Sequence, residues 1–223
     1  PPITLVVTTD KVYRDDGKGS YVESDPLGGH DPYSASKAMA DLLTQSWAAT
    51  NPQLKLHVAR AGNVIGAYDA SANRLIPDVI RSIRASTTMV VRQPNAIRPW
   101  QHVLDCLSGY LNLLDYARRD TELPVAMNFG PDPKSIKSVR ELLESAKEFL
   151  PKMTFAIEES DSSRKETQLL TLNSNLAFKT LLWENQLDFK LSVELSLAEL
   201  SSGIPLEVAT TQVQRFLELR ERR

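Results

Sequence analysis

The sequence lacks what several classes of protein require. Its single cysteine, Cys106, excludes a disulfide within the chain and suits a reducing compartment, so we expect a cytoplasmic protein. No apolar run approaches the length of about 18 residues that a membrane-spanning helix needs. The formal net charge of −2 argues against a general binder of nucleic acid or of membrane surfaces.

Two kinds of catalysis have no support in the sequence. The three histidines, His30, His57 and His102, do not have the spacing of metal ligands. No Gly-x-Ser-x-Gly turn is present to expose a serine nucleophile. We therefore expect neither a metal site nor a serine hydrolase.

The chain opens on Pro1-Pro2 and passes directly into the apolar run ITLVVT (3–8), without an initiator methionine or a signal peptide. Because this run resembles a buried strand, we expect the chain to be the later part of a longer protein.

Strand-like and helix-like segments then alternate. Strands are expected at 3–8, 54–60, 89–92 and 124–130, and helices at 32–50, 73–86, 105–119 and 138–150. Pro77 fits its helix only in the first turn, and Asp105 is expected to cap the next helix. After Pro151 shorter elements are expected, namely strands at 153–157 and 167–173 and helices near 174–182, 191–201 and 206–221. This order predicts an α/β fold with a largely parallel sheet and a smaller α+β lobe.

The segment DPYSASK places Tyr33 and Lys37 four residues apart at the start of a predicted helix, where they share a face. A free phenol has a pKa near ~10, and a neighbouring ammonium lowers that pKa toward the range of a general base. The alternative is that both residues lie on a solvated helix face without chemistry.

The polar segment Thr8-Thr9-Asp10-Lys11 directly follows the first predicted strand. The carboxyl ends of strands in α/β sheets are where ligands bind, so a hydroxyl, a carboxylate and an ammonium would be available there. The alternative is that Thr9 and Asp10 only cap the following turn.

Two further segments carry polar groups suited to a ligand. RAGNVIG follows the second predicted strand and contains Arg60 and Asn63. NAIRPWQHV offers the fork of Arg98 for a phosphate and the ring of Trp100 as an apolar wall. Any one arginine is more often a surface charge, but four such clusters in this order predict a site.

These motifs together resemble the extended short-chain dehydrogenase/reductase family of nucleotide-sugar enzymes. TTDK, GGHDPYSASK, RAGNVIG, RLIP (74–77) and AIRPWQHV carry the resemblance, which spans residues 3–130. It is greatest to the 4,6-dehydratases that act on CDP-glucose, since those that act on dTDP-glucose typically have Glu at the position of Lys11. Beyond residue 130 only KETQLLTLNSNLAFKTLLW (165–183) is similar, with Asn173 in place of Asp and Leu182 in place of Gly.

The resemblance implies a lyase with NAD as cofactor. Tyr33 would take the proton of the sugar's 4-hydroxyl, and Lys37 would favour the phenolate and bind the nicotinamide ribose. Thr9 would hydrogen-bond the 4-oxygen, Asp10 would protonate the leaving 6-hydroxyl, and Lys11 would take the C5 proton. The product would be a 4-keto-6-deoxy sugar nucleotide for deoxysugar synthesis, such as that of lipopolysaccharide O-antigen.

The resemblance also assigns the binding residues. The implied substrate-binding residues are Thr9, Asn63, Arg74, Leu75, Arg98 and Trp100, and the implied cofactor-binding residues are Tyr33, Lys37 and Arg60. Arg98 is expected at the diphosphate, Trp100 in the wall of the pocket and Trp183 in the packing of the small lobe. CDP-glucose is the implied substrate, and the full-length protein is expected to be a homodimer.

The family's glycine-rich turn for the dinucleotide pyrophosphate is absent, because no three of the nine glycines have the Gly-x-x-Gly-x-x-Gly spacing. Residues 1–130 are therefore expected to be the later half of a Rossmann-like, doubly wound cofactor domain, interleaved with substrate-binding segments at about 67–100. Residues 131–223 are expected to form mainly the substrate-binding lobe, and the chain alone is expected to be inactive.

Two alternatives stay open. One is another enzyme of the same family, such as a 4-epimerase or a sugar-nucleotide reductase, which would not need Asp10 and Lys11 for dehydration. The other is a non-catalytic protein that binds sugar nucleotides without a complete cofactor domain.

Overall fold

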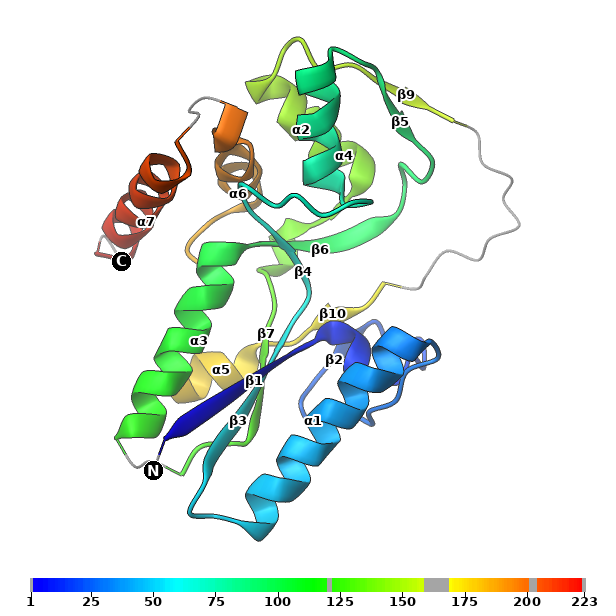
Figure 1. The fold of residues 1–223 in the computed structure, drawn as a ribbon. Helices are drawn as coiled ribbons and strands as arrows, with labels where there is room; N and C mark the ends of the chain where they lie inside the picture. The colour runs from blue at the N-terminus through cyan, green and yellow to red at the C-terminus, as the bar shows by residue number, and fades with distance from the viewer. Residues whose placement is uncertain (1, 120–121, 159–168, 201–203, 222–223) are drawn as a thin grey trace. The chain divides into compact units, whose positions relative to one another are not determined.

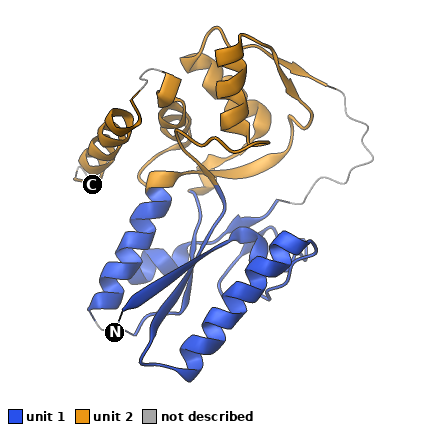
Figure 2. Ribbon diagram, in the orientation of Figure 1, with its two compact units in different colours: residues 1–63, 105–131, 168–185 blue, residues 64–104, 132–167, 186–223 orange. Residues whose placement is uncertain are grey.

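A computed structural model describes residues 2–119, 122–158, 169–200 and 204–221. The chain divides into two compact units that are each assembled from three stretches (Figures 1 and 2). Unit 1 contains residues 1–63, 105–131 and 168–185, and unit 2 contains residues 64–104, 132–167 and 186–223. Residues 168–185, which were expected in the C-terminal lobe, thus belong to unit 1.

Unit 1 is built on a parallel sheet with the strand order β1-β3-β7. The strands are β1 (Ile3–Thr9), β3 (Lys55–Ala61) and β7 (Ala126–Phe129), which confirms three of the expected strands. Thr8 pairs with Arg60, and Arg60 with Asn128, so these three residues form one row across the sheet.

Helices lie on both sides of this sheet, with α1 (Pro32–Thr50) on one side and α3 (Val103–Arg118) and α5 (Asn175–Leu181) on the other (Figure 1). The predicted bounds of α1 are confirmed. Its N-cap Asp31 accepts hydrogen bonds from two backbone N–H groups of the first turn, and Pro32 needs none. The prediction that Asp105 is the N-cap of α3 is wrong. The helix begins two residues earlier, so Asp105 lies in its first turn.

The side of the sheet that faces α3 and α5 has an apolar core. Its buried members are Ala59, Leu113, Met127, Phe129, Ala177, Leu181 and Trp183. A Cβ on Gly109 would lie 2.4 Å from the ring of Phe129, so glycine is what lets α3 approach β7 this closely. Trp183 contacts Phe129 edge to face at 5.1 Å, which places it in unit 1 and corrects its expected place in the small lobe.

The segment after β1 covers the carboxyl end of the sheet. It contains a 3-10 turn, η1 (Asp10–Val12), and the short strand β2 (Ser20–Tyr21), which pairs in parallel with β10 (Thr171–Leu172). The first residues of the strand expected at 167–173 lie outside the described residues. The rings of Tyr13 and Tyr21 stack with their centroids 5.1 Å apart. This contact joins the residues after η1 to strand β2.

Unit 2 combines two small sheets with helices. The sheets are β4-β6-β8 (Asn63–Ile65, Ile97–His102 and Ile136–Ser138) and the parallel pair of β5 (Met89–Val91) with β9 (Phe155–Ile157). The helices are α2 (Leu75–Ala85), α4 (Val139–Phe149), α6 (Phe189–Ser196) and α7 (Pro205–Glu221), with 3-10 turns η2 (Pro133–Ser135) and η3 (Ala198–Leu200). Pro77 lies in the first turn of α2, as its missing N–H requires. Strand β6 was not predicted.

Candidate active site

The Thr9–Lys11 turn is well ordered by its own hydrogen bonds. The hydroxyl of Thr9 donates to the Asp10 carboxylate at 2.9 Å and accepts from the backbone N–H of Lys11 at 3.4 Å. Thr9 and Asp10 are buried, whereas Lys11 is exposed. Thr9 therefore caps the turn, and the same contacts hold an acidic and a hydroxyl group at the carboxyl end of β1.

Tyr33 and Lys37 lie in the first two turns of α1. The side chain of Tyr33 is 51% exposed, so a ligand has access to it, and Lys37 is partly buried. The N-cap Asp31 accepts from the backbone N–H of Tyr33 at 2.9 Å and from the hydroxyl of Ser34 at 2.5 Å. These bonds, with a small contribution from the charge of Lys11, hold the pKa of Asp31 below its usual value.

Several contacts bring the Thr9–Lys11 turn to the start of α1. The N–H of Gly28 donates to the carbonyl of Val12 at 2.8 Å, and Gly29 packs on Ser34 so closely that a Cβ there would lie 2.2 Å from the serine Cβ. The helix also packs against β1, β3 and η1. The two motifs that follow one another in the sequence thus meet in the fold.

Arg60 does not lie where a cofactor could contact it. Its side chain is fully buried, and its guanidinium donates to both carboxylate oxygens of Asp41 at 2.8 Å. A third nitrogen, Nη1, donates to the hydroxyl of Tyr13 at 2.7 Å and to the carbonyl of Glu23 at 3.2 Å. Since no guanidinium surface remains for a ligand, we correct the expected cofactor contact of Arg60.

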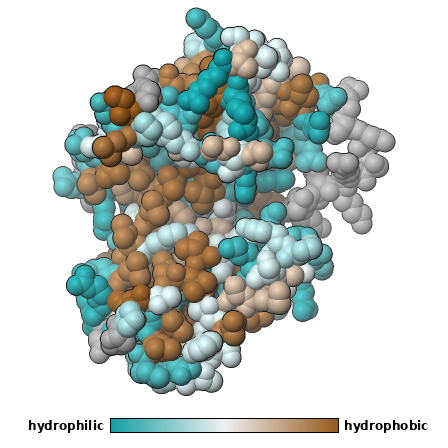
Figure 3. All heavy atoms as spheres, viewed as in Figure 1, coloured by the Kyte–Doolittle hydropathy of each residue, from teal (hydrophilic) through white to brown (hydrophobic). Residues whose placement is uncertain are grey.

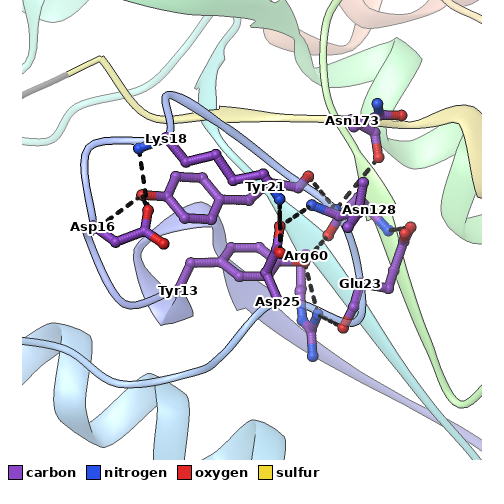
Figure 4. A network of polar contacts seen from close by, with 10 residues as sticks. Tyr13, Asp16, Lys18, Tyr21, Glu23, Asp25, Arg60, Asn128 and Asn173 are labelled. Atoms are coloured by element: carbon purple, nitrogen blue, oxygen red, sulfur yellow. Dashed lines mark hydrogen bonds and ion pairs between the residues drawn. The ribbon is translucent and has the colours of Figure 1, made fainter.

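The polar network around Arg60 extends to the third strand (Figure 4). Tyr13 donates to the side chain of Asn128 at 2.7 Å, and the Asn128 amide donates to the carbonyl of Tyr21 at 3.0 Å. Burial raises the pKa of Tyr13 to about 12, against the opposing charge of Arg60. Burial also raises the pKa of Glu23, whose carboxylate accepts from the N–H of Asn128.

The expected substrate residues lie at or beyond the passage into unit 2. Asn63 opens β4, and Leu75 packs partly buried against the apolar core of that unit. Arg74 is exposed at the N-cap of α2, and Arg98 on β6 donates to the neighbouring carbonyl of Ile97 at 2.7 Å.

Trp100 has a structural position. It is 6% exposed within the core of unit 2, and its ring N–H donates to the carbonyl of Lys137 at 3.0 Å. The side chain has too little surface to line a pocket in this structure, and we correct that expectation.

Sequence reasoning missed three residues of the site region, namely Tyr13, Asp41 and Asn128. The one available signal was Asp41, because a carboxylate four residues after Lys37 on an otherwise apolar and small-residue helix requires a partner. Among the described residues no group of three or more His, Cys, Asp and Glu could hold a metal ion. Over the same residues no helix is long and apolar enough to cross a membrane.

Comparison with known proteins places the sequence in one family. The sequence profile described as NAD dependent epimerase/dehydratase family matches residues 4–130. The CDP-glucose 4,6-dehydratase of Salmonella typhimurium is 37% identical over 148 residues, which cover 62% of this chain and 41% of that protein. The dTDP-glucose 4,6-dehydratase of Mycobacterium tuberculosis is 30% identical over 116 residues, which cover 50% of this chain and 34% of that one. The chain thus spans less than half the length of these relatives.

Solved structures share the fold. The crystal structure of dTDP-glucose 4,6-dehydratase from Bacillus anthracis in complex with NAD has a TM-score of 0.75 at 24% identity, over 88% of this chain and 61% of that one. RMD from Pseudomonas aeruginosa, complexed with NADPH, has a TM-score of 0.74 at 20% identity, over 90% of this chain and 67% of that one. These similarities confirm the expected α/β, Rossmann-like fold.

Proposed function

This chain belongs to the NAD dependent epimerase/dehydratase family, and from that premise we propose that it is the catalytic and substrate-binding part of a CDP-glucose 4,6-dehydratase. The family's dependence on NAD confirms the expected cofactor. The observation that carries the proposal is the approach of the Thr9–Lys11 turn to the first turn of α1, where Tyr33 is exposed.

In the proposed reaction Tyr33 removes the proton of the sugar's 4-hydroxyl, and the Lys37 ammonium favours the phenolate. Thr9 holds the 4-oxygen by a hydrogen bond. Asp10, as the carboxylic acid, donates a proton to the 6-hydroxyl, which leaves as water, and Lys11, as the free amine, takes the proton from C5. NAD, when bound, supplies the hydride acceptor for C4 and the hydride donor for C6.

Tyr33 and Lys37 are suited to the nicotinamide ribose, since both lie at the carboxyl end of the sheet and the phenol is accessible. No glycine-rich turn for the pyrophosphate occurs among the 223 residues, so the proposal leaves that contact to residues outside this sequence. The chain alone is therefore proposed to be inactive. Asn63, Arg74, Leu75 and Arg98 are proposed to bind the substrate, with Arg98 at its diphosphate.

The exposed apolar surface of unit 1 supports the proposal that a further segment packs against it. Among the described residues only β3 pairs with β1, so the other edge of that strand is open, and Val7 is 47% exposed on it. Apolar side chains gather over the region of β1 and α3 (Figure 3), where Leu107 and Leu111 are also exposed. Since parallel sheets are normally covered on both faces, we propose that the glycine-rich half of the cofactor domain packs here.

The outer face of α1 supports a homodimer of the whole protein. Met39, Leu43 and Trp47 recur at a spacing of four residues on this face, and each is more than half exposed. The only charged residues of the helix, Lys37 and Asp41, lie away from that face. An uncharged apolar stripe of this kind is typical of an interface.

The product, a CDP-4-keto-6-deoxyglucose, would serve deoxysugar synthesis, such as that of lipopolysaccharide O-antigen. Nucleotide sugars are soluble substrates, so the proposed location is the cytoplasm.

The test is an assay of the chain alone and of the chain joined behind the residues that precede the matched region in the Salmonella enzyme. Both are incubated with CDP-glucose and NAD, and the 4-keto product is followed by its absorbance in alkali. We expect product from the fusion, none from its Tyr33→Phe variant, and none from the chain alone. A fusion that epimerises its substrate without forming a 4-keto product would favour the sister enzymes of the family. A folded fusion that binds nucleotide sugars and converts none of them would refute the enzymatic reading.

A further inference from the structure

The helix that carries Tyr33 is attached to the sheet by one buried ion pair. Asp41 on α1 and Arg60 on β3 both have fully buried side chains, and two parallel hydrogen bonds of 2.8 Å join them. Gln45, one turn further along the helix, donates to the same carboxylate at 2.6 Å. Replacement of a buried pair by apolar residues of similar volume is often neutral for stability. The ion pair is therefore expected to contribute more to the orientation of α1 on the sheet than to the free energy of unfolding.

The same pair holds the Thr9–Lys11 turn at both of its ends. Thr8, the residue before the turn, donates its hydroxyl to the Asp41 carboxylate at 3.1 Å. Tyr13, the residue after η1, accepts from Arg60 at 2.7 Å and lies with its ring 5.0 Å from the guanidinium carbon. The turn is thus held between two contacts to one ion pair.

The helix side of the arrangement follows from the spacing along α1. Asp41 is four residues after Lys37 and eight after Tyr33, so the three lie on successive turns, about 6 Å apart along the axis. The contact at Asp41 fixes the rotation of α1 about its own axis and its distance from the sheet. The positions of Lys37 and Tyr33 on the same helix are thereby fixed as well.

We propose that Asp41 and Arg60 are positioning residues, which hold the Thr9–Lys11 turn and the Tyr33 helix in a single arrangement. The inference rests on the proposed function for its effect on catalysis, since both catalytic segments must meet one sugar ring. A misplacement of about 1 Å at a reacting group can lower a rate by about 100-fold. Both residues act through others and contact no substrate.

The first experiment compares kcat and KM of the fusion with those of its Asp41→Asn and Arg60→Lys variants. Asp41→Asn preserves the size of the side chain, and Arg60→Lys preserves the charge but loses the fork. We expect kcat to fall about 10- to 100-fold in each, with KM changed less than about threefold. The matched control is Leu113→Ala in the apolar core on the other side of the sheet, which lowers stability without touching either segment. Its kcat should stay near that of the parent wherever both are folded.

The second experiment needs no activity and uses the chain itself. Its six tyrosines are replaced by 3-fluorotyrosine, and the fluorine signal of Tyr33 is assigned through Tyr33→Phe. In Asp41→Asn and Arg60→Lys we expect the signals of Tyr33 and Tyr13 to move, while those of Tyr110 and Tyr116 on α3 stay in place. Leu113→Ala should produce the opposite pattern, because it lies beside the tyrosines of α3.

The outcomes separate the two proposals. An inactive fusion with a moved Tyr33 signal would refute the dehydratase and support the positioning role. An active fusion whose kcat is unchanged by Asp41→Asn, or a Tyr33 signal that is unchanged in the folded variants, would overturn the positioning role. If neither Asp41→Asn nor Arg60→Lys folds, Thr8→Val removes a single contact to Asp41 and should still move the Tyr33 signal, by a smaller amount.

Discussion

Leu182 has a backbone conformation that is unfavourable for its residue type. It ends α5 with φ 51° and ψ 33°, a left-handed conformation in which a Cβ is crowded, and its side chain is 74% exposed. Helices commonly have glycine at this position, and the resemblance noted for the sequence places glycine here too. The leucine therefore contributes strain and little burial.

We expect Leu182→Gly to raise the free energy of unfolding by about 0.5–1 kcal/mol, since relief of the left-handed strain exceeds the entropy that glycine adds to the unfolded chain. Urea denaturation of the chain measures the change. Leu182→Ala is the matched control, because it removes the same exposed side chain but keeps the Cβ. An equal gain in both variants would show that strain is not the cause.

His102 is a second residue with an environment that sequence alone did not reveal. The ring is fully buried at the end of β6, and its Nδ1 accepts from the N–H of Leu104 at 3.2 Å. This bond leaves the ring proton on Nε2, which has no hydrogen-bond partner among the described residues. Burial lowers the pKa of His102 from 6.5 to about 4.

Because the unfolded chain binds a proton at this histidine more readily than the folded one, His102 should make stability fall as the pH is lowered. The stabilisation is complete above the unfolded pKa of 6.5 and is lost progressively down to about pH 4, by up to about 3 kcal/mol. Urea denaturation at several pH values between 7 and 4 measures this slope. His102→Gln should reduce the slope of stability against pH. A smaller slope should remain from His57, whose pKa is also lowered by burial. A variant with the slope of the parent would contradict the assignment.

At the scale of elements, prediction from sequence succeeded where local chemistry decides the structure. The bounds of α1 were predicted from Pro32 at its start and from Asn51 and Pro52 after its end, and these signals are local to the segment. Strand β6 was missed because Arg98, Pro99 and Gln101 give it neither an apolar run nor a clean alternation. Its pairing with β4 on one side and with β8, about forty residues later, on the other is what makes it a strand.

The same distinction applies to the candidate site. The pair of Tyr33 and Lys37 was found from a spacing of four residues, and the Thr9–Lys11 turn from its place after a strand. The role of Arg60 was predicted wrongly, because its partner Asp41 lies nineteen residues away and only the packing of α1 on β3 joins them. Sequence shows which side chains can bind a charge, and the fold decides whether the charge is a ligand or another residue.

The outer face of α1 gives a prediction for this element. If its apolar stripe forms the proposed dimer interface, Leu43→Lys in the fusion should weaken association at least tenfold, because it buries a charge in that interface. Light scattering across a range of concentrations measures the association. Phe178→Lys, on a half-exposed residue of α5, adds the same charge elsewhere on unit 1 and should leave assembly unchanged. Association that Leu43→Lys does not weaken would argue for another interface.

At the scale of the whole molecule, unit 1 carries the proposed catalytic arrangement on a sheet whose edge strand β1 pairs only with β3 among the described residues. The buried network of Asp41, Arg60 and Asn128 ties α1 to all three strands, so the arrangement has its own internal support. The opposite situation holds at β1, where no second strand pairs within the described part of the chain and exposed Val7 leaves apolar surface uncovered. This contrast predicts that the isolated chain forms the arrangement of the proposed site but leaves exposed an apolar surface that another segment would cover.

The exposed surface can be measured with a hydrophobic dye such as anilinonaphthalene sulfonate. We expect the chain alone to bind the dye strongly and the fusion to bind it several times less, since the glycine-rich half would cover β1 and α3. Leu107→Ser with Leu111→Ser should lower dye binding to the chain alone, because both side chains are exposed on α3 and lie outside the core. Leu206→Ser, on a more exposed leucine of α7 in unit 2, should lower dye binding in the chain and in the fusion alike. Equal dye binding by chain and fusion would mean that the cofactor half does not pack on the exposed surface of β1 and α3.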